Sequence, residues 1–284
     1  GQWVGDQVLI PDDNNESFGD SIAMDGDTVM VGATEHQNNA IRGAVYVFVR
    51  NELGVWSQTQ RLQTNADHRD RFGSALALEG DRALIGATGF EQERGAAYIY
   101  ERNGQGQWSQ VTRIVANDGV GGGGNPDRFG HSVALAGAVA VVGAYNADVN
   151  GAAYSYRRNG QGAWVQEQKI SAAREGSFGY DMTIEDQTLL ISAQHDAVYT
   201  YVQDAEGQWQ ENQRFAPDLP IVNNHFGRRI ATSGNDVLVS SPEYHLGAYT
   251  FVMGGDVCTN DGACVCVEGA AGALCDERPN CGDG

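Results

Sequence analysis

The sequence of 284 residues predicts an all-β fold of five similar sheets, and three repeated patterns lead to this prediction. A Phe-Gly pair recurs at intervals of 48 to 57 residues. Each pair is followed by apolar and aromatic runs of strand length, and five segments beginning with Trp alternate with the pairs. A period near 50 residues is typical of propellers and similar arrays. The five pairs are Phe18-Gly19, Phe72-Gly73, Phe129-Gly130, Phe178-Gly179 and Phe226-Gly227.

Each repeat contains four strand signals. The first is a run of alternating small and large residues after Phe-Gly, as in residues 132–135, which ends at a short turn. An apolar run such as 29–33 follows, then an aromatic run such as 43–48. The fourth is a Trp segment such as 164–170, whose apolar-polar alternation indicates a strand with one solvated face. Four short antiparallel strands per repeat predict the blades of a β-propeller.

Small residues end the second strand signal in the first three repeats. They are Gly32-Ala33, Gly86-Ala87 and Gly143-Ala144. Near the axis of a propeller the sheets crowd together, and only small residues permit a close approach of the backbones. We therefore expect these positions to lie where neighbouring blades meet.

The two ends of the repeat region complement each other. The chain begins with a Trp segment at Trp3 that no Phe-Gly unit precedes, and no Trp segment follows the fifth unit, residues 226–251. We expect the N-terminal strand to complete the fifth blade and close the ring, which leaves no open sheet edge. Residues 1–254 are thus predicted to form one five-bladed propeller of four-stranded antiparallel blades.

Charge and cysteine usage restrict the classes of function. The chain has 18 basic and 37 acidic residues, a net charge of −19, which disfavours nucleic acid and anionic lipid surfaces as partners. No apolar run approaches the ~18 residues of a membrane-spanning helix, so we expect no membrane insertion. All five cysteines lie within the last 27 residues, which favours an oxidising, extracellular or cell-surface setting. The start at Gly1 fits a removed signal peptide or a longer parent chain.

The repeated pattern Phe-Gly, then Val-Gly-Ala, then Gly-Ala-x-Tyr-x-Phe/Tyr resembles the FG-GAP repeat, the blade unit of integrin alpha-subunit propellers and many bacterial surface proteins. The resemblance covers about residues 1–252. Units four and five depart from it at Ile191-Ser192-Ala193 and Val239-Ser240-Ser241. The resemblance implies an extracellular binding or cell-adhesion module.

Integrin-type units carry a calcium loop, Asp-x-Asp-x-Asp-Gly, that this chain lacks. Tight turns such as Asp25-Gly26-Asp27 and Glu79-Gly80-Asp81 stand in its place and offer two carboxylates at most, whereas Ca²⁺ takes six to eight oxygen ligands. We therefore expect no metal or other cofactor, with calcium as the alternative.

Residues 255–284 form a Cys-rich tail that we expect to be a connector separate from the propeller. The spacing Cys258-x5-Cys264-x-Cys266-x8-Cys275 resembles the second half of an EGF-like module. That resemblance implies a Cys266–Cys275 disulfide and leaves Cys258 to pair with Cys264, although other connectivities stay open. Cys281 has no obvious partner, so we expect it to pair with a following module or another subunit.

The residues that follow each Phe-Gly pair are the candidate ligand-binding residues, because the first strand of each blade lines the central channel and ligands bind at such mouths. They vary within an otherwise repetitive framework. The alternative is that they only hydrate the channel and pair with one another. The candidates are Asp20, Ser74, His131, Tyr180, Asp181 and Arg228.

No local catalytic motif is present. Gly-x-Ser-x-Gly and His-Glu-x-x-His are both missing from the sequence, and Asp20 and Asp181 are the only two channel carboxylates available for glycosidase chemistry. We therefore expect a protein that is not an enzyme and that recognises a protein or carbohydrate ligand through the propeller face. The alternative is a structural subunit of an extracellular filament or surface assembly, with copies of itself as partners; a glycosidase is the third possibility.

Overall fold

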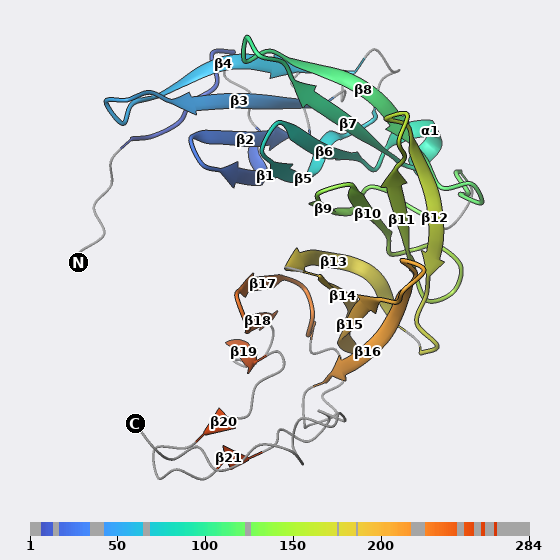
Figure 1. Ribbon diagram of the computed structural model, residues 1–284. Helices are drawn as coiled ribbons and strands as arrows, with labels where there is room; N and C mark the ends of the chain where they lie inside the picture. Colours follow the sequence, from blue (N-terminus) through green and yellow to red (C-terminus); the bar gives the residue numbers. More distant parts are fainter. Residues whose placement is uncertain are drawn as a thin grey trace.

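The computed structural model describes residues 7–13, 17–34, 43–64, 69–122, 126–174, 176–185, 187–216, 225–242 and 247–252, together with the backbone of 257–258 and 264–265. Five antiparallel sheets are arranged around a common axis, and the first strand of each sheet is innermost (Figure 1). Neighbouring inner strands contact one another from the first sheet to the fifth. The predicted five-bladed, all-β propeller is therefore confirmed.

Each of the first four blades has four strands in chain order from the axis outward. Blades one and two comprise β1 (Phe18–Asp25), β2 (Thr28–Ala33), β3 (Ala44–Arg50), β4 (Trp56–Leu62), β5 (Phe72–Glu79), β6 (Arg82–Ala87), β7 (Ala96–Arg102) and β8 (Trp108–Ile114), with the short α1 (Phe90–Glu93) before β7. Blades three and four comprise β9 (Ser132–Ala136), β10 (Val139–Ala144), β11 (Ala152–Arg158), β12 (Trp164–Ile170), β13 (Ser177–Glu185), β14 (Thr188–Gln194), β15 (Ala197–Gln203) and β16 (Trp209–Phe215). In the described part of blade five there are three strands, β17 (Ile230–Ser233), β18 (Asp236–Ser241) and β19 (Gly247–Val252).

The hydrophobic core lies between blades rather than inside them. One cluster joins Leu84 and Ile99 of blade two to Val142 and Tyr154 of blade three, and similar clusters join the other successive blades. Phe129 is fully buried in this cluster, and its ring packs edge-on against Tyr154 at a centroid distance of 5.5 Å. Phe72, Phe178 and Phe226 are likewise fully buried in the clusters at their junctions, whereas Phe18 is partly buried against a cluster within blade one.

The glycines of the second strands bring neighbouring blades into close contact, as predicted. A Cβ on Gly86 of blade two would lie 2.0 Å from the carbonyl oxygen of Gly130 in blade three. Gly130 itself has φ of +91°, a conformation that favours glycine. Blade four differs, because Ser192 replaces this glycine and its Cβ lies 3.1 Å from the position that a Cβ on Gly227 would take.

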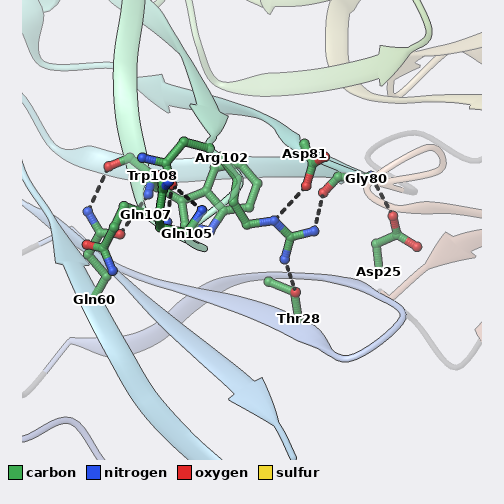
Figure 2. A network of polar contacts seen from close by, with 10 residues as sticks. Asp25, Thr28, Gln60, Gly80, Asp81, Arg102, Gln105, Gln107 and Trp108 are labelled. Carbon is green, nitrogen blue, oxygen red and sulfur yellow. Dashed lines mark hydrogen bonds and ion pairs between the residues drawn. The ribbon is translucent and has the colours of Figure 1, made fainter.

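A second set of junction contacts lies at the turns between the first and second strands (Figure 2). Asp25 of blade one accepts a hydrogen bond from the backbone amide of Gly80 in blade two, at 2.6 Å. Arg102 of blade two donates to Asp81 of its own blade at 2.7 Å and to Thr28 of blade one at 2.9 Å. These turns therefore join consecutive blades as well as ending strands.

The N-terminal segment occupies the position of an outer strand next to blade one. The Gln7 side chain donates to the carbonyl of Trp56 at 2.7 Å and accepts from its amide at 2.9 Å. Gln60 makes the same pair of bonds to Trp108 in the following blade, and Gln168 makes it to Trp209. All three glutamines stand four residues after a Trp.

This equivalence supports ring closure but does not test it. Residues 7–10 belong to no strand, and residues 1–6, which include Trp3, lie outside the described part of the chain. Closure of blade five by the N-terminal strand therefore stays a prediction, as does the domain boundary at residue 254.

We expect Gly86→Ala to lower the free energy of unfolding by about 1–3 kcal/mol or more, because the added methyl group would overlap the carbonyl of Gly130. Gly104→Ala is the matched control, since nothing lies within 4 Å of a Cβ at that turn glycine. Urea unfolding monitored by Trp fluorescence measures both. Equal stabilities of the two variants would contradict the close approach.

We expect Gln7→Leu to lower the free energy of unfolding by about 1 kcal/mol, because it removes two hydrogen bonds to the backbone of Trp56. Gln105→Leu, in an exposed turn of blade two, is the control. Deletion of residues 1–10 is expected to cost several times more if these residues complete blade five. A truncated protein as stable as the full chain would rule out closure.

Candidate ligand pocket in the propeller channel

The inner strands enclose a pocket of about 430 Å³, which we call the mouth pocket. Each of the first four blades contributes the three residues that follow its Phe-Gly pair, and blade five contributes one arginine. The lining residues are Gly19, Asp20, Ser21, Ile22, Ser74, Ala75, Leu76, His131, Ser132, Val133, Tyr180, Asp181, Met182 and Arg229.

An irregularity in the inner strands positions these side chains. The pairing of β1 with β2 shifts between Phe18 and Ser21, and that of β13 with β14 shifts between Phe178 and Met182. A bulge of this kind bends the strand and redirects its side chains. The residues after Phe-Gly therefore lie in the pocket, while the Phe rings remain in the core.

Five of the six predicted site residues line the mouth pocket: Asp20, Ser74, His131, Tyr180 and Asp181. The prediction of Arg228 is corrected, because its neighbour Arg229 lines the pocket instead. In blade five the inner strand begins only at Ile230, and the residues before it form a turn in which the Arg228 amide donates to the carbonyl of His225. Arg229 has the same repeat position as Asp181 in blade four, three residues after the Phe of Phe-Gly. That these residues bind a ligand stays a prediction.

Two aromatic rings, His131 and Tyr180, line the mouth pocket, and Tyr145 packs against both of them from outside the lining. The ring centroid of His131 lies 4.4 Å from that of Tyr145 and 4.7 Å from that of Tyr180, and the two tyrosines are 5.4 Å apart. Arg128 donates to the Tyr145 hydroxyl at 2.6 Å and forms an ion pair with Glu93 at 3.2 Å. Such a cluster presents flat apolar surface beside polar groups, which suits a sugar-like ring.

Sequence reasoning did not find Tyr145 and Arg128. Tyr145 directly follows Gly143-Ala144, a position held by Thr34 in blade one and Thr88 in blade two. Arg128 directly precedes Phe129 and has φ of +55°. A comparison of the residues on each side of the repeated motifs, and not only those after Phe-Gly, would have singled out both.

His131 is held neutral. Burial lowers the pKa of His131 to about 4, and the positive charges of Arg229 and Arg128 act in the same direction. At neutral pH its imidazole is therefore an uncharged donor and acceptor of hydrogen bonds.

Asp181 titrates closer to neutral pH than an exposed carboxyl. Burial raises the pKa of Asp181 to about 6, against the opposing effects of the Ile230 amide and Arg229. The Ile230 amide donates to Oδ2 of Asp181 at 2.8 Å across the junction of blades four and five. At pH 7 Asp181 is thus a carboxylate that takes up a proton as the pH falls through about 6.

Two serine hydroxyls accept hydrogen bonds from the backbone amides of Asp181 and Arg229, the charged residues that blades four and five contribute to the pocket. The Asp181 amide donates to the hydroxyl of Ser192 at 2.9 Å, and the Arg229 amide donates to the hydroxyl of Ser240 at 3.0 Å. Both serines stand where the first three blades have the glycine of Val-Gly-Ala. The departures of units four and five from the repeat therefore coincide with the charged residues of the pocket.

A second cavity of about 220 Å³ lies along the inner strands next to the mouth pocket. Leu76, Val133 and Met182 line both spaces. The remaining lining is Ala77, Leu78, Ala134, Leu135, Thr183 and Ile184.

Acidic turn residues are engaged in blade contacts. Glu79 accepts a hydrogen bond from the Gly137 amide and Glu185 accepts one from the Gly234 amide, as Asp25 does from Gly80. Among the described residues no three His, Cys, Asp or Glu side chains gather as ligands for a metal ion. Independence from calcium stays a prediction, and these hydrogen bonds give a different role to the turn carboxylates.

The predicted disulfides fall largely outside the described residues. Cys266, Cys275 and Cys281 are not described, and of Cys258 and Cys264 the structure describes the backbone alone. The two lie opposite each other in a small antiparallel pair formed by β20 (Val257–Cys258) and β21 (Cys264–Val265). The EGF-like tail and its connectivity are not shown.

Comparison with known proteins supports the repeat assignment. Residues 3–48, 56–100 and 108–156 each match the model of the FG-GAP repeat. The protein is thus a β-propeller whose first three blades match the FG-GAP repeat. A search of curated proteins found no match.

Solved structures share the fold at low identity. A putative 6-phosphogluconolactonase from Bacteroides uniformis is similar with a TM-score of 0.64 and 12% identity, over 89% of this chain and 71% of that one. A protein from Lactobacillus plantarum has a TM-score of 0.58 and 15% identity, over 81% of this chain and 66% of its own. A periplasmic gluconolactonase from Pseudomonas aeruginosa has a TM-score of 0.44 and 15% identity, over 78% and 77%.

The expectation that the protein is not an enzyme is wrong, because this propeller fold occurs in a protein named as a lactonase. At 12% identity the likeness concerns the fold alone. The expectation failed because it relied on local motifs such as Gly-x-Ser-x-Gly, whereas a propeller gathers side chains from distant inner strands into one pocket.

Within the described residues no helix is long and apolar enough to cross a membrane.

Proposed function

We propose that the protein binds a small, hydroxylated anion, such as a sugar acid, in the mouth pocket. The observation that carries this proposal is the composition of the pocket, which is lined by Arg229 together with the aromatic rings of His131 and Tyr180. Arginine pairs well with carboxylates and phosphates, and an aromatic face suits the apolar face of a sugar ring.

The negative charge of the whole chain distinguishes the pocket from the rest of the surface as a site for anions. With a net charge of −19, the surface repels anions in general. Arg128 and Arg229 are near enough to His131 to depress its pKa, so they bring positive charge to the pocket. An anion that enters is held by these groups and not by the overall field. Protein or glycan recognition at a cell surface, and assembly with further copies, remain compatible proposals for the rest of the propeller face.

We expect Arg229→Gln to weaken gluconate binding about 10- to 100-fold, since a hydrogen bond to a charged group contributes about 1.5–3 kcal/mol. Arg174→Gln, an exposed arginine outside the pocket, is the control. Isothermal titration calorimetry measures both. For the original protein, affinity should rise as the pH falls from 7 to 5, because Asp181 loses its negative charge through about pH 6. Binding insensitive to both changes would refute an anion site here.

Hydrolysis of a sugar lactone is a second candidate, favoured by the position of Asp181 in the pocket. Its carboxylate would take a proton from water as the water oxygen attacks the lactone carbonyl. The ring carbon–oxygen bond then breaks, the ring oxygen takes up a proton, and a hydroxy acid is released. A general base acts best with a pKa near the working pH, which the value of about 6 satisfies.

We expect Asp181→Asn to lower δ-gluconolactone hydrolysis, measured above the spontaneous rate in a pH-stat, by about 100-fold or more. Activity of the original protein should increase through about pH 6, because the base is active only as the carboxylate. Asp236→Asn, at an exposed turn of blade five, is the control. A flat pH profile, or equal rates for the two variants, would exclude Asp181 as the base. The pH trends of binding and hydrolysis are opposite, so the two candidates are separable.

A further inference from the structure

The connection between β6 and β7 in blade two contains three consecutive residues in a left-handed conformation. Glu91, Gln92 and Glu93, which belong to α1, have φ of +45°, +60° and +67°. This conformation is costly for every residue except glycine, and other residues adopt it singly rather than in runs. Strain of this kind persists only where the surrounding structure imposes it, and it is concentrated at functional sites. The turn 91–93 is therefore a candidate for a functional part of the molecule, although none of its residues lines the mouth pocket.

The turn holds Glu93 against the entry to blade three. The Glu93 amide donates to the carbonyl of Gly89 at 3.2 Å, and Phe90 is buried in the core between blades one and two. The Glu93 carbonyl accepts from the Arg128 amide at 2.9 Å. Its carboxylate accepts from Nε of Arg128 at 3.3 Å and lies 3.2 Å from another nitrogen of the same guanidinium. One residue thus holds both the backbone and the side chain of Arg128.

Arg128 connects Glu93 to the mouth pocket through Tyr145. The guanidinium donates to the Tyr145 hydroxyl at 2.6 Å. The Tyr145 ring packs against His131 and Tyr180, at centroid distances of 4.4 and 5.4 Å. Only His131 and Tyr180 of this group line the pocket. The contacts from the strained turn to the pocket lining are therefore continuous.

Stability alone does not account for the turn. The side chains of Glu93 and Arg128 are each 35% exposed, and ion pairs at such sites contribute little to the free energy of unfolding. The same pair does determine where the charge of Arg128 lies. That charge is one of the two that lower the pKa of His131, so its position affects the pocket.

We propose that the turn 91–93 orients the mouth pocket from outside it, because Glu93 fixes Arg128 and Arg128 fixes Tyr145 behind the rings of His131 and Tyr180. Glu93 and Arg128 are thus positioning residues of the site. Side chains that are held in place before binding lose less freedom when a ligand arrives, which increases affinity. The inference rests on the proposed function for the ligand, but the arrangement of the free pocket can be tested by itself.

An NMR titration of His131 in the free protein tests the positioning without a ligand. Its pKa of about 4 is lowered by burial and by the charges of Arg229 and Arg128. If Glu93 fixes Arg128, Glu93→Gln releases the guanidinium to solvent and the pKa of His131 rises, as it does in Arg128→Gln. If Glu93 acts only as a nearby negative charge, its loss lowers that pKa instead. A lowered or unchanged pKa in Glu93→Gln would overturn the inference.

Gluconate binding, measured by isothermal titration calorimetry, gives a second readout. Glu93→Gln and Tyr145→Phe should each weaken binding about 3- to 10-fold, because each removes one link, and a hydrogen bond contributes about 0.5–1.5 kcal/mol. Arg128→Gln should weaken it at least as much, and adding Glu93→Gln to it should cause no further loss. Glu101→Gln is the matched control, since it breaks an ion pair with Arg158 of similar length and exposure, and should change nothing.

The two readouts separate the inference from the function on which it rests. If gluconate does not bind but the pKa of His131 rises in Glu93→Gln, the proposed function fails and the positioning is supported. If gluconate binds and Glu93→Gln changes neither its affinity nor that pKa, the positioning fails and the function is supported. Additive losses in the double variant would also overturn the inference, because Glu93 and Arg128 would then act separately.

Discussion

The propeller depends on one backbone contact that recurs at three junctions. A Cβ on Gly32, Gly86 or Gly143 would lie 2.3, 2.0 or 2.1 Å from the carbonyl oxygen of a Phe-Gly glycine in the next blade. Because no side chain separates the backbones there, the apolar faces on both sides close into shared clusters. The same contact fixes the start of each inner strand, and with it the residues that enter the channel.

The sequence was sufficient to predict the blades because each one repeats the same chemistry. Phe-Gly, the small residues of the second strand and the Trp segment all lie where their patterns indicate. What the repeat could not specify was which of the two arginines in blade five lines the pocket: Arg229 does, at the repeat position of Asp181, whereas Arg228 does not. In the other four blades both positions after Phe-Gly line the pocket, so the repeat alone could not separate Arg228 from Arg229.

Contacts between blades could not be predicted from the sequence of a single repeat. The pairing of Gln7, Gln60 and Gln168 with the backbone of a later Trp becomes visible only when sheets are side by side. From the sequence alone the acidic turn residues likewise had no assigned role, yet Asp25, Glu79 and Glu185 each accept a hydrogen bond from the next blade. The exclusion of an enzyme failed for the same reason, since it considered short motifs and not residues brought together by the ring.

The junction of blades four and five shows how a departure from the repeat makes a site. Glycine at position 192 would permit the close contact seen elsewhere, yet Ser192 stands there and its hydroxyl accepts from the Asp181 amide. Blades one and three have a serine at the position of Asp181, and each donates to a carbonyl of the next blade: Ser21 to Gly73 and Ser132 to Gly179. An aspartate cannot donate in this way, so the direction of the bond is reversed and its carboxylate accepts from the Ile230 amide. The Asp181 carboxylate thus bridges this junction where blades one and three use a serine hydroxyl, and the repeats that depart most from the motif contribute Asp181 and Arg229 to the pocket.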